Sequence, residues 1–198
     1  EMDYRVGQIL DCIEEAGITD NTLVVFSSDN AAGGTNAFQG RSNGPFRGSF
    51  VTPPWEGSMR TAAMVRWPGK VPAGVVTEEM MSAHDWYATF AALAGASDKV
   101  PTDRPIDGID ASRFLLGESE TSGREHILFF GPDGSLMSIK WHNIKAVLRY
   151  CEGIDQPIVT PSWPMVFDLA SDPGEIHNIM DTKLDRAGWW ASRSSSSP

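Results

Sequence analysis

Apolar residues near the start of the chain recur first with helical spacing and then as a continuous run. Val6, Ile9, Leu10 and Ile13 stand at positions i, i+3, i+4 and i+7, and Gly17 follows them. Because this spacing aligns them on one helix face and glycine commonly ends a helix, we predict a helix over residues 3–16. The apolar run at 22–28 is short, which indicates a buried strand.

The rest of the chain alternates apolar runs with turn residues. Pro132-Asp133-Gly134 forms one turn signal and His142-Asn143 another, each between two runs with strand character. Ser82 followed by Asp85 gives a capping pattern for a helix. The predicted strands are 22–28, 61–67, 125–130, 135–141, 144–150 and 165–169, and the predicted helices are 3–16, 84–95 and 110–117.

This order of elements predicts an α/β fold class followed by a small antiparallel sheet unit. Residues 1–120 look like the last strands and helices of a larger α/β sheet domain. Residues 121–182 are rich in strands joined by tight turns, which is typical of an antiparallel sheet. The tail at 183–198 ends in a serine-rich stretch and is expected to be disordered.

Asp29 and Asn30 directly follow the predicted strand at 22–28. Ligands of open α/β sheets gather beyond the carboxyl ends of strands, and carboxylate and amide oxygens suit Ca²⁺ or Mg²⁺ better than softer metals. The pair is therefore a candidate metal site, with an Asx-turn that merely ends the strand as the alternative. The loop from 30 to 60 is too long for a mere connection, and compact domains usually reserve such loops for binding.

Six sequence blocks follow one another in this chain. They are Asp20–Asn30, Phe46–Gly48, Trp55–Arg60, Arg66–Gly69, Ser82–Phe90 and Phe167–Asn178. In this order they resemble the Asp-Asn, Leu-Arg-Gly, Glu-Gly-Gly-x-Arg, Trp-Pro-Gly, Asp-x-x-Pro-Thr and Asp-Pro-x-Glu-x-x-Asn motifs of type I sulfatases, a family of the alkaline phosphatase superfamily. The resemblance covers about residues 1–180 and is specifically to the second half of such an enzyme.

The resemblance implies an alkaline phosphatase-like sulfatase fold and, in an intact enzyme, arylsulfatase-like hydrolysis of a sulfate ester. It implies that Asp29 and Asn30 supply two oxygen ligands of a Ca²⁺ or Mg²⁺ ion. Arg47 could orient the sulfate or hold the loop by pairing with Glu56, and His84 could contact substrate or form a local hydrogen bond. The implied substrate is a sulfated small molecule or carbohydrate, and family habit implies a periplasmic or secreted location.

The chain departs from the family pattern in two respects. It has no copy of Cys/Ser-x-Pro-x-Arg, whose first residue becomes the formylglycine nucleophile; Ser162 and Ser171 precede a Pro at the right offset but lack the Arg. We therefore take the chain as a partial product, expect formylglycine only in the missing N-terminal half, and expect the isolated chain to be inactive. Phe50 stands where many members have a sulfate-supporting Lys.

Composition limits the partners. The chain has 198 residues, a formal net charge of -10 and a pI ≈ 4.8. Nucleic acid and acidic membrane surfaces would repel such a chain, so neither is expected as a partner, whereas a local cation could still admit an anionic sulfate ester. The sequence has no apolar run long enough for a membrane span, its two distant cysteines give no disulfide framework, and it does not indicate an oligomeric state.

Two other functions are compatible with these observations. A phosphoester or phosphonate hydrolase of the same superfamily would use a similar metal pair, but those relatives usually place a His after the Asp, where this chain has Asn30. The chain could also be a catalytically inert binding fragment, because it lacks the nucleophile.

Overall fold

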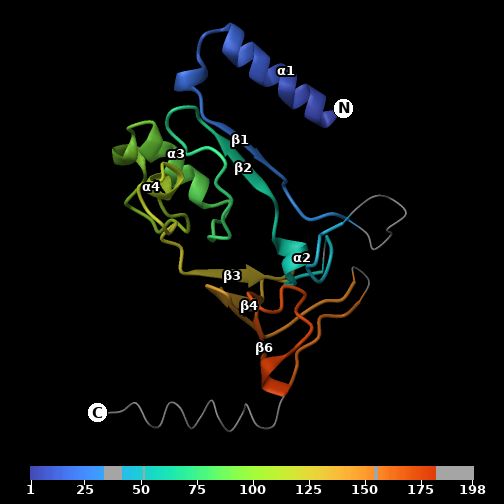
Figure 1. Cartoon of the computed structure of the whole chain (residues 1–198). Coiled ribbons are helices and arrows are strands. Elements are labelled where there is room, and N and C mark those ends of the chain that lie inside the picture. The colour runs from blue at the N-terminus through green and yellow to red at the C-terminus, as the bar shows by residue number, and fades with distance from the viewer. Residues whose placement is uncertain (34–41, 51, 154–155, 182–198) are drawn as a thin grey trace. The chain divides into compact units, whose positions relative to one another are not determined.

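The computed structural model describes residues 1–33, 42–50, 52–153 and 156–181, and these form two compact units (Figure 1). The first unit comprises Glu1–Ser27 and Ala62–Arg124, and the second comprises Ser28–Thr61 and Glu125–Pro198. The loop after the first strand thus belongs to the same unit as the C-terminal strands. The division of the chain at about residue 120 stays a prediction, and the expected tail at 183–198 lies outside the described residues.

In the first unit, helix α1 (Met2–Glu15) precedes an antiparallel pair of strands, β1 (Val24–Ser27) and β2 (Ala63–Arg66). The two strands lie side by side in Figure 1. Gly17 ends α1 with φ +67, a left-handed conformation that glycine adopts without steric cost, and its N–H bonds the Glu14 carbonyl at 2.9 Å. The remaining elements of this unit are η1 (Thr19–Asn21), α3 (Asp85–Leu93), η3 (Ser97–Lys99) and α4 (Ser112–Leu115).

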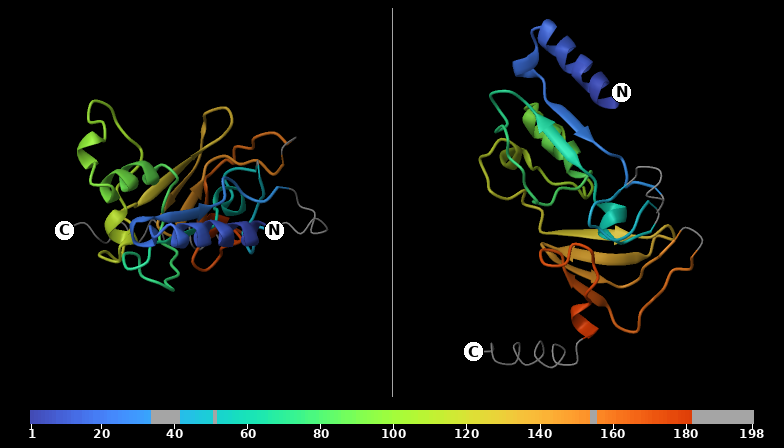
Figure 2. Two further views of the ribbon diagram at one scale, coloured as in Figure 1. Left: turned by 90° about the horizontal axis from the view of Figure 1, so that it is seen from above. Right: turned by 45° about the vertical axis from the view of Figure 1, so that its right-hand side comes forward.

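The second unit is built on a four-stranded antiparallel sheet with the order β3-β4-β5-β6. Neighbours in the sequence are therefore neighbours in the sheet, as the right-hand view of Figure 2 shows. Side chains alternate along β4 and β5, so that one sheet face presents Ser138, Lys140, Lys145 and Val147 in paired positions. The elements are β3 (His126–Phe130), β4 (Leu136–Trp141), β5 (Ile144–Val147), β6 (Met165–Asp168), α2 (Glu56–Met59) and η4 (Ile179–Asp181).

The core of the second unit forms around Trp55, which is 0% exposed. Between ring centroids, it lies 5.3 Å from Tyr150 in a tilted arrangement and 6.1 Å from Phe167 in an edge-to-face arrangement, the latter a geometry that aromatic pairs prefer. Val147 completes this buried cluster. Trp55 is therefore a packing anchor of this unit.

All of the predicted helices and strands are confirmed, with ends that shift by a few residues. The strand predicted at 144–150 ends at Val147, because Leu148 and Arg149 both donate their N–H groups to the Met137 carbonyl and break the ladder. Tyr150 resumes pairing as an isolated bridge to Val159. The short helix α2 lies in a segment read from the sequence as loop.

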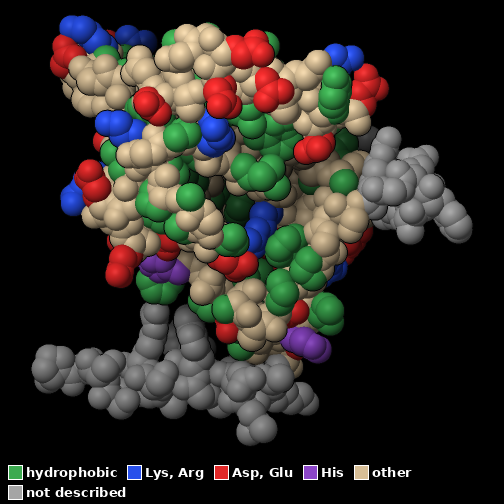
Figure 3. Space-filling model, turned by 45° about the horizontal axis from the view of Figure 1, so that its top comes forward, with side chains coloured by type: hydrophobic (Ala, Val, Ile, Leu, Met, Phe, Trp, Pro, Cys, Tyr) green, Lys and Arg blue, Asp and Glu red, His purple; other side chains and the backbone are tan. Residues whose placement is uncertain are grey.

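The surface carries acidic and basic side chains together. On the face drawn in Figure 3, acidic, basic and apolar side chains are interspersed rather than separated by type. Within the described residues, no helix is long and apolar enough to cross a membrane. An open hollow of about 500 Å³ lies along α1 and is lined by Arg5, Gln8, Ile9, Cys12, Ile13 and Ile18.

Candidate functional site

Asp29 and Asn30 lie just beyond β1, near the start of the second unit, and both side chains are exposed. Ser28 Oγ donates to the backbone carbonyl of Asn30 at 2.7 Å, so the turn is closed by serine. Among the described residues, neither the Asp29 carboxylate nor the Asn30 carboxamide makes a hydrogen bond or ion pair. In an Asx-turn, the Asp29 or Asn30 side chain would accept a hydrogen bond from a nearby backbone N–H, and the described residues show no such bond.

These two side chains fit a hard cation as a partial ligand set. They offer one carboxylate and one amide oxygen, the donor types that Ca²⁺ and Mg²⁺ prefer, and both are available. Ca²⁺ takes about 6–8 oxygen ligands, so two donors are not enough for a closed site. No group of three or more His, Cys, Asp or Glu side chains is placed to hold a metal within the ranges the structure describes.

The backbone just after the pair is fixed by Asn43. Its Oδ1 accepts the Ala32 N–H at 2.9 Å, and its Nδ2 donates to the Ala32 carbonyl at 3.3 Å and to the Gly48 carbonyl at 3.2 Å. The Phe50 N–H also donates to the Ala32 carbonyl, at 3.1 Å. Ala31, between Asn30 and these contacts, is buried at 6% exposure. The exposed pair is therefore attached to a well-bonded segment.

Arg47 uses its guanidinium inside the unit. The Cζ atom lies 3.6 Å from the centroid of the Trp55 ring, Nη1 donates to the Glu175 carbonyl at 3.1 Å, and Nη2 pairs with the Glu152 carboxylate. The expected pairing of Arg47 with Glu56 is wrong, because the Glu56 carboxylate is buried among lysines instead. Stacking on an indole with two directed hydrogen bonds suits the planar guanidinium and makes Arg47 a structural residue of the loop.

Glu56 belongs to a buried ion cluster that sequence reasoning missed. Lys140 Nζ lies 2.8 Å from Glu56 Oε2, and Lys145 Nζ lies 3.1 Å from Glu56 Oε1 and 2.9 Å from Glu175 Oε1. The last contact is an ion pair without hydrogen-bond geometry. Glu175 Oε2 accepts the Glu56 N–H at 2.7 Å and so caps α2 from a distant part of the chain.

The two carboxylates of this cluster have opposite pKa shifts. Burial acts to raise the pKa of Glu56, but the nearby Lys145 and Lys140 outweigh it and hold the pKa below its usual value. Burial raises the pKa of Glu175 above its usual value, and Lys145 offsets this effect only in part. Lys145 and Glu175 are each 0% exposed, so the cluster is shielded from solvent. The sequence signal was available, since Glu56 and Glu175 both occur in recognised motifs and Lys145 occupies an inward strand position.

In the first unit, Asp85 rather than His84 is the buried polar residue at the start of α3. The Asp85 carboxylate accepts the Ser82 N–H at 2.7 Å and the Ile109 N–H at 2.9 Å, and it forms a two-point pair with Arg124. Burial acts to raise the pKa of Asp85, but the hydrogen bond from Arg124 and the two backbone bonds lower it overall. The Ser82–Asp85 pattern is formed only in part: the Asp85 carboxylate accepts the Ser82 N–H, but the N-cap of α3 is His84 and it makes no side-chain cap bond.

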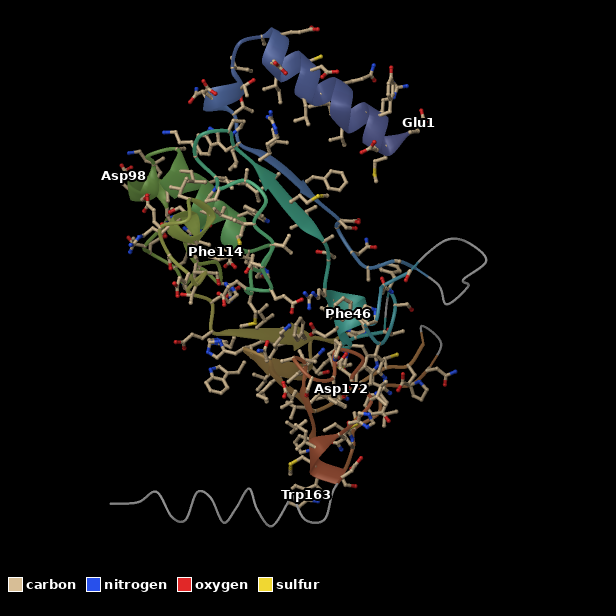
Figure 4. The ribbon with its side chains drawn as sticks, in the orientation of Figure 1. Glu1, Phe46, Asp98, Phe114, Trp163 and Asp172 are labelled. Atoms are coloured by element: carbon tan, nitrogen blue, oxygen red, sulfur yellow. The ribbon has the colours of Figure 1, made fainter. Side chains whose placement is uncertain are left out.

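His84 is exposed and makes a local contact, with Ser82 Oγ 2.9 Å from its Nδ1. A substrate role for His84 or Arg47 stays a prediction. Phe50, at the position of the family lysine, is 44% exposed and offers no charge there. Phe46, the residue before Arg47, lies beside α2 (Figure 4), and the guanidinium carbon of Arg60 lies 4.6 Å from its ring centroid.

Known protein families match most of this chain. The family model described as "Sulfatase" matches residues 1–96, and the model described as "N-sulphoglucosamine sulphohydrolase, C-terminal" matches residues 53–187. Steryl-sulfatase of Rattus norvegicus is 34% identical over 215 residues, which cover 95% of this chain and 37% of that protein. N-acetylgalactosamine-6-sulfatase of Canis lupus familiaris is 34% identical over 197 residues, which cover 88% of this chain and 37% of that protein.

Solved structures show the same relationship in three dimensions. The PsFucS1 sulfatase from Pseudoalteromonas sp. superposes with a TM-score of 0.78 at 25% identity, covering 96% of this chain and 40% of that one. A phosphonate monoester hydrolase of Agrobacterium radiobacter shares the fold, with a TM-score of 0.60 at 24% identity over 98% of this chain and 38% of that one. This chain thus spans little more than a third of the length of the curated relatives it matches. With its ordered motifs, its matches to both family models and its likeness to solved sulfatases of the alkaline phosphatase-like α/β fold, the chain belongs to the sulfatase family and corresponds to its C-terminal portion.

Proposed function

We propose that this chain is part of a sulfuric ester hydrolase that cleaves a sulfate ester with the help of a bound Ca²⁺ or Mg²⁺ ion. The observation that carries the proposal is the Asp29–Asn30 pair, which lies just beyond β1 in a chain of the sulfatase family and presents two exposed oxygen donors with no partner among the described residues. A hard cation at such a site polarises the sulfate oxygens of the substrate. Asp29 and Asn30 would hold it through their side-chain oxygens.

The proposal assigns roles to four residues of this chain. Asp29 and Asn30 bind the cation, while Arg47 shapes the loop that follows them and His84 remains a candidate substrate contact. The formylglycine nucleophile and the further ligands would come from outside this chain, since its sequence has no Cys/Ser-x-Pro-x-Arg motif. The unit boundary near residue 120 and the small C-terminal subdomain at 121–182 are part of the same proposal.

The substrate class in the proposal is a sulfated small molecule or carbohydrate. One relative is named for a steryl sulfate, and another is named for the 6-sulfate of N-acetylgalactosamine. What these names share is a sulfate ester on an alcohol oxygen, and that bond is the one we assign to this enzyme.

A phosphonate or phosphoester hydrolase is the second candidate, because a phosphonate monoester hydrolase shares the fold with a TM-score of 0.60. Asn30 after Asp29 favours the sulfatase, since the phosphoester and phosphonate hydrolases of the superfamily usually place a His at that position. The curated relatives above are sulfatases by name.

Calorimetric titration with Ca²⁺, and with Mg²⁺ for comparison, tests the metal pair. We expect the wild-type chain to bind one ion weakly, because two protein donors leave most of the coordination to water, and we expect Asp29→Ala to lose that binding, because the variant removes the charged donor. Asp11→Ala is the matched control, because Asp11 is an exposed carboxylate on α1, in the other unit. Equal binding by the wild type and Asp29→Ala would show that Asp29 is not a ligand.

A further inference from the structure

We propose that Asn43 is a positioning residue for the Asp29–Asn30 metal pair. Its carboxamide ties the backbone just beyond the pair to the turn that carries Arg47. The inference rests on the proposed function in that it takes Asp29 and Asn30 as metal ligands. Asn43 itself contacts neither the pair's side chains nor, in this proposal, the cation.

The contact between Asn43 and Ala32 runs in both directions. The Ala32 N–H donates to Asn43 Oδ1 at 2.9 Å, and Asn43 Nδ2 donates to the Ala32 carbonyl at 3.3 Å. A side-chain amide thus pairs with a backbone residue as one strand residue pairs with another, which fixes the position and the direction of the chain. Ala32 is two residues after Asn30, so little freedom remains between the fixed point and the ligands.

Asn43 is itself fixed by the turn that follows it. Its Nδ2 also donates to the Gly48 carbonyl at 3.2 Å, and the Phe50 N–H donates to the Ala32 carbonyl at 3.1 Å. Gly48 has φ +87, and a Cβ there would lie 2.7 Å from Thr52 Oγ1 and 2.7 Å from Trp55 Cβ. The turn is therefore packed tightly against the buried indole.

The turn at Arg47 and Gly48 is attached to the buried core of the unit. The Gly57 N–H donates to the Arg47 carbonyl at 2.7 Å, and the Arg47 guanidinium stacks on Trp55 and reaches the Glu175 carbonyl. Glu175 is held by Lys145 inside the ion cluster. A continuous series of contacts thus leads from the fully buried Lys145 to the backbone of Ala32, two residues after Asn30.

Only an amide can make all three Asn43 contacts. It needs one acceptor for the Ala32 N–H and two donor hydrogens for the two carbonyls, which is the hydrogen-bonding capacity of asparagine. Aspartate keeps the acceptor but places a charge against two carbonyl oxygens, and alanine removes every contact. We therefore expect Asn43→Asp and Asn43→Ala both to release the segment.

Backbone ¹⁵N order parameters at Asp29 and Asn30 test the inference without any metal. We expect values near about 0.85 in the wild-type chain and below about 0.6 in Asn43→Ala and Asn43→Asp. Asn178→Ala is the matched control, because Asn178 Oδ1 also accepts two backbone N–H groups in the same unit, from Val166 and Met180. We expect this control to leave Asp29 and Asn30 ordered. Unchanged order in the Asn43 variants, or low order already in the wild type, would overturn the inference.

Two further measurements distinguish a loss of folding from a loss of metal binding in these variants. Amide signals of β4 and β5 report whether the sheet is intact in each variant, and Asn43→Asp, the smaller change, serves if Asn43→Ala does not fold. Calcium titration of the same variants is expected to show at least about tenfold weaker binding for Asn43→Ala than for Asn178→Ala. If Asp29→Ala loses binding while Asn43→Ala keeps wild-type affinity, the positioning role fails and the metal pair stands. If the wild type binds no calcium, the metal assignment fails for this chain, and the order parameters still decide the role of Asn43.

Discussion

Lys145 Nζ lies 2.9 Å from Glu175 Oε1, and neither side chain is exposed to solvent. The lysine comes from the middle of the sheet and the glutamate from the last described segment of the chain. Glu175 also caps α2 through its carboxylate, and its backbone carbonyl accepts a hydrogen bond from Arg47. This buried pair therefore connects the C-terminal motif to the loop that follows the candidate metal ligands. The stability of the second unit should therefore depend strongly on it.

Replacing Lys145 by methionine should destabilise the chain by about 3–5 kcal/mol, because it leaves the buried Glu175 carboxylate without a cation. Urea denaturation followed by circular dichroism measures the change. Lys99→Met is the control, since Lys99 is 78% exposed and its pair with Asp98 should contribute at most about 1 kcal/mol. Similar losses for the two variants would show that the buried pair has no special role.

Asp85→Asn should change how the free energy of unfolding depends on pH. The folded-state pKa of Asp85 lies below its ordinary value of 3.8, so the folded state binds fewer protons than the unfolded state in this range. The contribution of Asp85 is therefore fully present above 3.8 and is lost as pH falls through the lowered pKa. The wild type should lose stability in that window, and the variant should lose less.

Urea midpoints measured across this pH range, wild type against variant, check the expectation. Asp103→Asn is a suitable control, because Asp103 also has a lowered pKa but is fully exposed, where it pairs with Arg104. A wild-type and Asp85→Asn difference that stays constant with pH would contradict the assignment. The control should change the acid response far less than Asp85→Asn does.

Local sequence patterns were enough to predict most of the helices and strands, because those elements depend on nearby residues. The spacing of aliphatic residues predicted α1 and Gly17 predicted its end, and the turn at Pro132–Gly134 joins β3 to β4 as expected. The end of β5 at Val147 was missed, because it depends on two N–H groups sharing one carbonyl on the neighbouring strand.

The site was only partly predictable, because its contacts join distant residues. Asp29 and Asn30 could be found from their place after a strand, but the partners of Arg47 could not, since Glu152 and Glu175 are more than a hundred residues away. The helix α2 was missed for the same reason: Trp55 provides no side-chain cap, and the cap comes from Glu175. Periodicity carries no information about such pairings.

Gly57→Ala should destabilise the second unit by at least about 2 kcal/mol. A Cβ at this position would lie 2.5 Å from the Arg47 carbonyl oxygen and 2.8 Å from two others, all of them backbone atoms that cannot easily move. Gly7→Ala is the control, because nothing lies within 4 Å of a Cβ at Gly7 in α1. That change should stabilise the helix by about 0.5–1 kcal/mol. Thermal unfolding of both variants checks the opposite signs, and a neutral Gly57→Ala would mean that the turn can shift.

The chain alone should not hydrolyse p-nitrophenyl sulfate above the uncatalysed rate. It supplies two candidate metal ligands but no motif for formylglycine, and a cation without a positioned nucleophile cannot complete the displacement. The assay is release of p-nitrophenol with Ca²⁺ present, with p-nitrophenyl phosphate as the parallel substrate for the phosphoester alternative. Asp29→Ala and Asp11→Ala distinguish real from contaminating activity, because only the first removes a candidate ligand. Sulfate release that disappears in Asp29→Ala and persists in Asp11→Ala would contradict the expectation and place a nucleophile within these 198 residues.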